Sequence, residues 1–190
     1  WQPLINNYLK GKRDPMIDLM AWNADGTRMP WRMHTEYLNR LYLKNELATN
    51  RFVHADQRVR LSDIRLPMFV VGTEADHVAP WTSVYKVDNL VRSDDFTFLL
   101  TAGGHNAGII CGPVHPKRSY KVRTRHLVDP HLAPEEWAEE APRLPGSWWP
   151  EWQGWLAKHS SGKTKPPKMG APAKGYTVLE DAPGQYVHLK

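Results

Sequence analysis

Two side chains near the middle of the chain, Asp76 and His105, are spaced as a catalytic acid and base could be. Asp76 follows the apolar run 67–72, and His105 follows the run 96–101 after a double glycine. A carboxylate that accepts the Nδ1–H of an imidazole fixes its tautomer and stabilises the imidazolium. The imidazole can then take a proton from a nucleophile and return it to a leaving group, which is the chemistry of acyl transfer.

The elements that must position these residues can be read from the apolar pattern. The run 67–72 is short and apolar, which predicts a strand buried on both faces, as in parallel sheets, and the run 96–101 predicts another strand. Between them Pro80 can begin a helix, and apolar residues recur at helical spacing: Trp81, Val84, Val87 and Leu90. A strand–helix–strand unit predicts an α/β fold, a parallel sheet with flanking helices, and places both loops on the same sheet edge.

The order of the two residues along the chain indicates a particular triad. In the α/β-hydrolase fold the nucleophile comes first, then the acid, then the histidine, so Asp76 and His105 would be the acid and the base. Gly103 and Gly104 are expected to let the backbone turn sharply beside a nucleophile, and His77 to shape the loop around Asp76 or contact a neighbouring element. A histidine after two glycines is also common as a plain surface residue, and that interpretation stays open.

The nucleophile that such a triad needs is not found in this chain. No G-x-S-x-G motif or cysteine equivalent occurs in it. Cys111 comes after His105, which is the wrong order, and it lies in an apolar segment where a free cysteine usually acts as a small core residue.

Composition excludes several other classes of protein. A single cysteine cannot form an intramolecular disulfide or a cysteine-rich zinc module. No metal site is expected, because HExxH and CxxC are absent and His115, His126 and His131 lack ligand spacing. A net charge of +5 without a recognisable nucleic-acid motif predicts no nucleic-acid partner. No apolar run approaches the roughly 20 residues of a transmembrane helix.

The remaining segments give weaker patterns. Residues 35–47 have apolar residues at helical spacing, with Thr35 as the expected N-cap. Regularity fades after residue 114. The basic stretch 117–125 is expected to be a solvated face, or a cluster that meets coenzyme A phosphates. Residues 158–174 hold five lysines and no acid, which predicts a surface strap, and four apolar residues after it could dock back: Val178, Leu179, Tyr186 and Val187.

Several motifs together resemble the C-terminal portion of the poly(3-hydroxyalkanoate) synthases, also called poly-beta-hydroxybutyrate polymerases. In chain order they are Asn6-Asn7-Tyr8-Leu9-x-Gly11, Asp18-Leu19-x-x-Trp22-Asn23-x-Asp25-x-Thr27, Asp76-His77-x-x-Pro80-Trp81, Gly104-His105-x-Ala107-Gly108, Gly146-Ser147-Trp148-Trp149-Pro150-x-Trp152 and Ala182-Pro183-Gly184-x-Tyr186-Val187. The match is collinear over nearly the whole chain. Asn106 and Cys111-Gly112 differ from the residues common in that family and leave the substrate chain length open.

The resemblance implies a cysteine-nucleophile acyltransferase with an α/β-hydrolase fold and a helical cap. It would polymerise 3-hydroxyacyl-coenzyme A, a substrate and not a cofactor, and release coenzyme A. Asp76 and His105 carry over as acid and base. Residues 1–58 would be part of the cap, 59–157 the closing half of the core and 158–190 the strap and docking tail. The resemblance also implies a homodimer at the surface of polyester granules in the cytoplasm. Its other partners would be the growing polyester chain and the remainder of the synthase.

The chain opens on Trp1 with neither an initiator methionine nor a signal peptide, and we expect it to be part of a longer protein and inactive alone. Two other functions stay open. One is an α/β-hydrolase esterase or thioesterase, which shares the acid–histidine order but transfers the acyl group to water. The other is a non-catalytic, granule-associated binding module.

Overall fold

A computed structural model describes residues 1–12, 26, 28–114, 117–181 and 184–185. Contacts divide the chain into two compact units, one of residues 36–164 and one that joins residues 1–35 to 165–190. The larger unit holds the sheet and both predicted site residues. The predicted boundaries at residues 58 and 157 concern the organisation of the whole protein and stay predictions.

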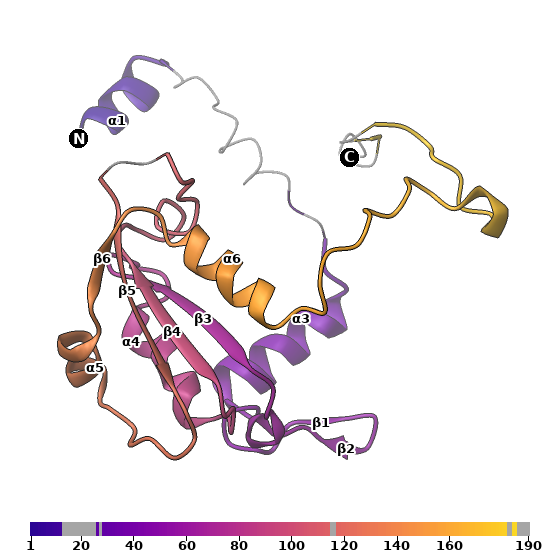
Figure 1. Cartoon of the computed structure of the whole chain (residues 1–190). Coiled ribbons are helices and arrows are strands. Elements are labelled where there is room, and N and C mark those ends of the chain that lie inside the picture. The colour runs from indigo at the N-terminus through magenta and orange to yellow at the C-terminus, as the bar shows by residue number, and fades with distance from the viewer. Residues whose placement is uncertain (13–25, 27, 115–116, 182–183, 186–190) are drawn as a thin grey trace. The chain divides into compact units, whose positions relative to one another are not determined.

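The larger unit is built on a four-stranded sheet in the order β3-β4-β5-β6 (Figure 1). β3 (Met68–Thr73) and β4 (Phe96–Thr101) are parallel, with Thr73 opposite Thr101 at their carboxyl ends. β5 (Ser119–Arg125) and β6 (Arg143–Pro145) continue the sheet in antiparallel fashion. The predicted parallel strand pair is therefore confirmed, whereas the two antiparallel strands beyond it were not predicted.

Helices cover both faces of this sheet (Figure 1). On one face lie α4 (Trp81–Tyr85), which continues as a 3₁₀ turn over Lys86–Asn89, and α5 (Pro134–Glu140). On the other face lies α6 (Trp149–Lys158). The predicted helix after Pro80 is confirmed, but its second half is wound more tightly than an α-helix.

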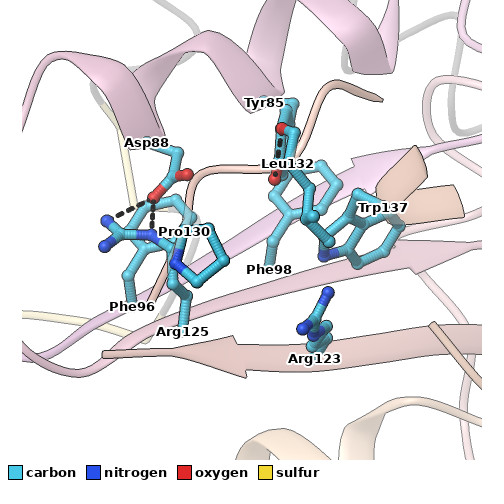
Figure 2. Close-up of a pocket in the computed structure, with 9 residues that line it drawn as sticks. All are labelled: Tyr85, Asp88, Phe96, Phe98, Arg123, Arg125, Pro130, Leu132 and Trp137. Carbon is cyan, nitrogen blue, oxygen red and sulfur yellow. Dashed lines mark hydrogen bonds and ion pairs between the residues drawn. The ribbon is translucent and has the colours of Figure 1, made fainter. Parts of the chain in front are cut away.

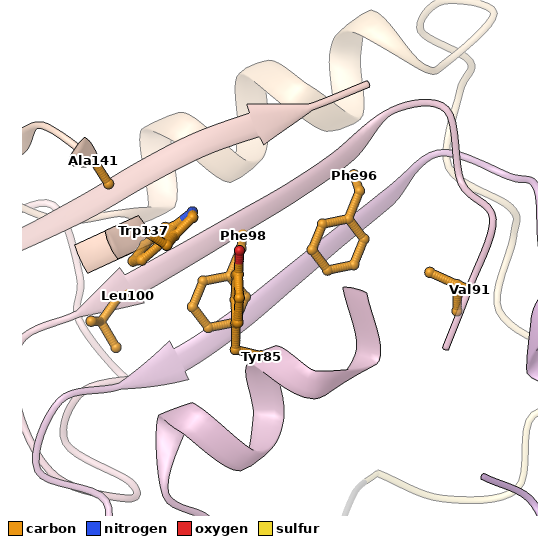
Figure 3. Close-up of a cluster of buried hydrophobic side chains, with 7 residues drawn as sticks. All are labelled: Tyr85, Val91, Phe96, Phe98, Leu100, Trp137 and Ala141. Carbon is orange, nitrogen blue, oxygen red and sulfur yellow. The ribbon is translucent and has the colours of Figure 1, made fainter. Parts of the chain in front are cut away.

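Strand β4 is buried along its whole length and separates two apolar cores. Its side chains alternate between the faces, as the pleat of a strand requires. Phe96, Phe98 and Leu100 pack with Tyr85 and Trp137 on the side of α4 and α5, as Figure 3 shows. On the opposite side the second core contains Leu99, Cys111, Tyr120 and Trp148. This double burial explains why four of the six residues in the run 96–101 are large and apolar.

The basic stretch 117–125 is not the solvated face that we expected. Most of it forms β5, in which polar and apolar residues alternate. Tyr120 and Val122 join the core beside α6. The basic residues Lys121, Arg123 and Arg125 lie on the side of α4 and α5. Arg125 Nη2 lies 2.6 Å from Asp88 Oδ1, and Arg123 Nη1 lies 2.6 Å from Glu140 Oε2. Arg123 and Arg125 thus have acidic partners, and Lys121 donates to Ala138 O. A role of the stretch in binding coenzyme A phosphates stays a prediction.

The helix expected over residues 35–47 begins earlier and ends earlier. α3 spans Trp31–Tyr37, and a π-helical turn over Leu38–Leu43 follows it. Thr35 is therefore inside the helix, where its hydroxyl donates to Trp31 O at 2.9 Å instead of capping the first turn. A short hairpin of β1 (Val53–His54) and β2 (Gln57–Arg58) comes next.

The smaller unit contains little regular structure among its described residues. α1 (Gln2–Leu4) leads into a π-helical turn over Ile5–Leu9, and a 3₁₀ turn spans Pro172–Lys174. The docking of Val178 and Leu179 onto the core concerns both units of the chain and stays a prediction. Tyr186 and Val187, and most of the motif at residues 18–27, lie outside the described residues. No helix in the described part of the chain is long and apolar enough to cross a bilayer.

Candidate active site

The parallel pairing of β3 and β4 carries on beyond the strand ends and joins the two predicted loops. The N–H of Glu74 donates to Thr101 O, and the N–H of Ala75 donates to Gly103 O, both at 2.9 Å. The acid loop after β3 and the histidine loop after β4 therefore leave the sheet side by side. This is the sheet edge at which open α/β sheets place their functional groups.

Asp76 is held in place by four hydrogen-bond donors. Its Oδ1 accepts the backbone N–H groups of Val78 at 2.9 Å and Ala79 at 2.8 Å. Its Oδ2 accepts the hydroxyl of Thr73 at 3.2 Å and His105 Nδ1 at 2.9 Å. The N–H of Ala79, followed by the contact with His105, lowers the pKa of Asp76 far below its usual range. Asp76 is thus a fixed anion at neutral pH.

The titration of Asp76 can be followed by carbon-13 NMR of its carboxyl group. We expect a midpoint well below the ordinary aspartate value of about 3.9. Because folding lowers this pKa, the ionised carboxylate stabilises the fold above about pH 3.9, and the contribution is lost as the pH falls through the lowered value. The same residue in urea provides the control. A midpoint in the folded chain equal to that in urea would contradict the hydrogen-bond arrangement.

His105 lies next to this carboxylate and is accessible on its outer side. Its side chain is 45% exposed, whereas that of Asp76 is 9% exposed. Since Asp76 only accepts hydrogen bonds, the network assigns the ring proton of neutral His105 to Nδ1. The lone pair of Nε2 is then free to take a proton, which is the state a general base needs. His77 is exposed and has no part in holding Asp76; backbone N–H groups do this instead.

The histidine loop is turned by one glycine and packed by another. Gly103 has a φ of +118°, a region that residues with a Cβ rarely adopt. Gly104 has no such requirement, because a Cβ there would make only an ordinary contact, 3.6 Å from Ala75 O. Gly108 is the tight position: a Cβ on it would lie 2.6 Å from Thr73 Cγ2. Thr73 and Gly108 were not among the predicted site residues.

Replacing Gly108 with alanine is expected to destabilise the fold by about 1–3 kcal/mol, the usual effect of overfilling a packed site. Thr73 is 2% exposed and has no room to move away from the new methyl group. Denaturant unfolding of the chain measures this change. Gly112→Ala is the matched control, since nothing lies within 4 Å of a Cβ at that position. Equal stability of the two variants would contradict the close packing of Gly108 against Thr73.

Cys111 is a core residue, as the sequence predicted. It is fully buried and packs with Leu99, Tyr120 and Trp148. Its thiol is not accessible beside His105. Within the described residues, no group of three or more histidine, cysteine, aspartate or glutamate side chains is arranged to hold a metal ion.

Two cavities lie away from Asp76 and His105. The one in Figure 2 is enclosed by aromatic side chains and by Asp88, which binds Arg125. Its volume of about 10 Å³ suits a single water molecule and no substrate. Burial raises the pKa of Tyr85 in its wall to about 12. A groove of about 270 Å³ lies between α6 and the start of β4, at the opposite end of that strand from the histidine loop.

Comparison with known proteins gives close matches over the whole chain. The poly(3-hydroxyalkanoate) polymerase subunit PhaC of Rhizobium meliloti is 36% identical over 190 residues, which is 100% of this chain and 30% of the relative. The corresponding subunit of Cupriavidus necator is 36% identical over 193 residues, or 100% of this chain and 31% of the relative. The chain belongs to the poly(3-hydroxyalkanoate) polymerase family. No protein-family model matches it.

The similarity extends to a further poly(3-hydroxyalkanoate) polymerase. Poly(3-hydroxyalkanoate) polymerase 2 of Ectopseudomonas oleovorans is 35% identical over 189 residues, which cover 98% of this chain and 32% of the relative. The chain therefore spans about 30% of the length of the curated polymerases that it matches. Within this span lie the paired Asp76 and His105, and no accessible cysteine is present in the described residues.

Proposed function

We propose that this chain supplies the acid and the base of a poly(3-hydroxyalkanoate) polymerase, as its C-terminal part. The observation that carries the proposal is the hydrogen bond between His105 Nδ1 and Asp76 Oδ2, at 2.9 Å, at the carboxyl edge of a parallel strand pair. The nucleophile would be a cysteine in the part of the polymerase that this chain does not span.

The sheet supports an α/β-hydrolase core for the whole polymerase. β3 pairs with β4 along one edge, and its other edge pairs with no strand among the described residues. An unpaired edge of six residues with an apolar sequence would invite aggregation unless another strand covered it. We expect a further strand to pair with β3 in the complete fold and to extend the sheet towards the nucleophile.

In the proposed reaction His105 first removes the proton of the cysteine thiol. The thiolate attacks the thioester carbon of a 3-hydroxyacyl-coenzyme A, an acyl-cysteine bond forms, and the coenzyme A sulfur leaves and takes the proton from His105. His105 then deprotonates a 3-hydroxyl group, whose oxygen attacks an acyl-cysteine carbon. The ester bond of the polymer forms, the acyl–sulfur bond breaks, and the cysteine sulfur leaves and takes the proton from His105. Asp76 stays ionised and stabilises the imidazolium at each step. The scheme uses no cofactor.

Two finer expectations accompany this function. We infer that the complete polymerase works as a homodimer at the surface of its polyester granule, in the cytoplasm, and that residues 1–58 contribute to a cap over the site. Both follow from the family to which the chain belongs. Size measurement of the complete polymerase with and without substrate tests the first.

The nature of the product separates this function from an esterase or thioesterase. The complete polymerase that contains this chain should release coenzyme A from 3-hydroxybutyryl-coenzyme A and convert the acyl groups into a precipitating polyester. Formation of free 3-hydroxybutyrate in an amount equal to the released coenzyme A would favour the hydrolase. Absence of coenzyme A release would favour a non-catalytic binding module.

A further inference from the structure

The segment that follows His105 is tied to the core by three neighbouring side chains. The indole Nε1–H of Trp148 donates to Gly108 O at 3.0 Å, and that of Trp149 donates to Ile109 O at 2.9 Å. The hydroxyl of Ser147 donates to Cys111 O. Residues 147–149 therefore hold the carbonyl groups through which the histidine loop returns to the core.

Of these bonds, the one to Gly108 lies nearest to the acid–base pair. The N–H of Gly108 donates at 2.9 Å to Gly104 O, in the residue directly before His105. Gly108 also packs directly against Thr73, so closely that a Cβ on Gly108 would not fit. The hydroxyl of Thr73 donates to Asp76 at 3.2 Å. A displacement of Gly108 would thus disturb the backbone that carries the base and the hydroxyl that holds the acid.

Trp148 is well placed to fix Gly108. It is 6% exposed, and its ring stacks on Phe69 with centroids 6.5 Å apart and lies 5.8 Å from the ring of Trp152. Gly108 O accepts one other hydrogen bond, from Thr101 Oγ1, which is longer at 3.4 Å. Trp148 is the stronger of the two donors, and its rigid packing fixes the position of the carbonyl.

We propose that Trp148 is a positioning residue for the His105–Asp76 pair. It acts through the Gly108 carbonyl and touches neither the substrate nor the reacting atoms. This inference rests on the proposed function. Because misplacing a catalytic group by about 1 Å can lower a rate about 100-fold, losing the indole N–H should affect turnover more than substrate binding.

The test replaces Trp148 with phenylalanine, which keeps an aromatic ring but removes the N–H, in the complete polymerase. We expect kcat to fall roughly 10- to 100-fold with little change in KM. In nitrogen-15 histidine spectra, the hydrogen-bonded Nδ1–H signal of His105 should broaden through faster exchange with water. Trp152→Phe is the matched control: it replaces a tryptophan whose ring contacts that of Trp148, and Trp152 makes no indole hydrogen bond to a described residue. Both readouts should stay normal there.

Thr101→Val removes the other hydrogen bond to Gly108 O and keeps the side-chain volume. It should lower kcat a few-fold, and combining it with Trp148→Phe should give a non-additive effect, since both act on Gly108 O. If the Trp148→Phe polymerase fails to fold, the kcat and the His105 signal of the Thr101→Val polymerase test the inference instead. A folded Trp148→Phe polymerase, or in its place a Thr101→Val polymerase, with normal kcat and an unchanged His105 signal would overturn the inference. A different result would contradict the proposed function itself: a His105→Ala polymerase that keeps its activity.

Discussion

The His105→Ala variant of the complete polymerase should release coenzyme A about 10⁴- to 10⁶-fold more slowly, the range found when a triad histidine is removed. Among the described residues, His105 carries the only imidazole hydrogen-bonded to Asp76, and the substitution removes it. Without it the cysteine thiol and the 3-hydroxyl group would both have to ionise unaided. Steady-state coenzyme A release, followed with a thiol reagent, measures the loss.

Two matched variants separate this chemical role from damage to the fold. His77→Ala removes an exposed histidine from the acid loop itself and should leave the rate unchanged. Cys111→Ala removes the fully buried cysteine and should lower stability modestly while activity persists. Turnover that survives His105→Ala but disappears in Cys111→Ala would contradict the acid–base assignment.

The Asp76→Asn variant should lower kcat by about 10⁴-fold, by analogy with other triads in which the same change leaves the geometry intact. The structure gives the reason. Oδ1 accepts the N–H groups of Val78 and Ala79, so an asparagine would keep its oxygen there and turn its NH₂ group towards His105. The NH₂ group would donate to Nδ1, which forces the ring proton onto Nε2 and blocks the base.

A nearby carboxylate provides the control for Asp76. Glu74 is two residues away and forms a partly exposed ion pair with Arg143. Glu74→Gln should change stability by at most about 1 kcal/mol and leave turnover unaffected. If both variants lost activity equally, the general negative charge of the loop would matter, and the specific hydrogen bond to His105 would not.

The strand pair and the meeting of Asp76 with His105 could be predicted because their signals are local. Runs 67–72 and 96–101 are short and rich in apolar residues because their strands are partly or fully buried, and each ends directly before a loop with a titratable residue. The parallel register then brings Asp76 to His105 without further information. The catalytic role itself rests on the proposed function, which the local pattern alone does not decide.

The antiparallel strands and the tryptophan contacts could not be predicted in the same way. In β5 the alternation of Tyr120 and Val122 with basic residues has the period of a strand, but the density of charge concealed it. α6 contains Gly154 in its interior, which weakens the helical signal. The bond from Trp148 to Gly108 spans 40 positions in sequence, and no local pattern predicts such a pairing.

The most direct test of the proposed acid–base role is a structure of the complete polymerase. We predict that a cysteine Sγ lies within about 4 Å of His105 Nε2, while Nδ1 keeps its hydrogen bond to Asp76. That cysteine would come from outside the present chain and would face a site large enough for a thioester. A structure in which no cysteine lies near His105, or in which Asp76 and His105 are apart, would contradict the proposal.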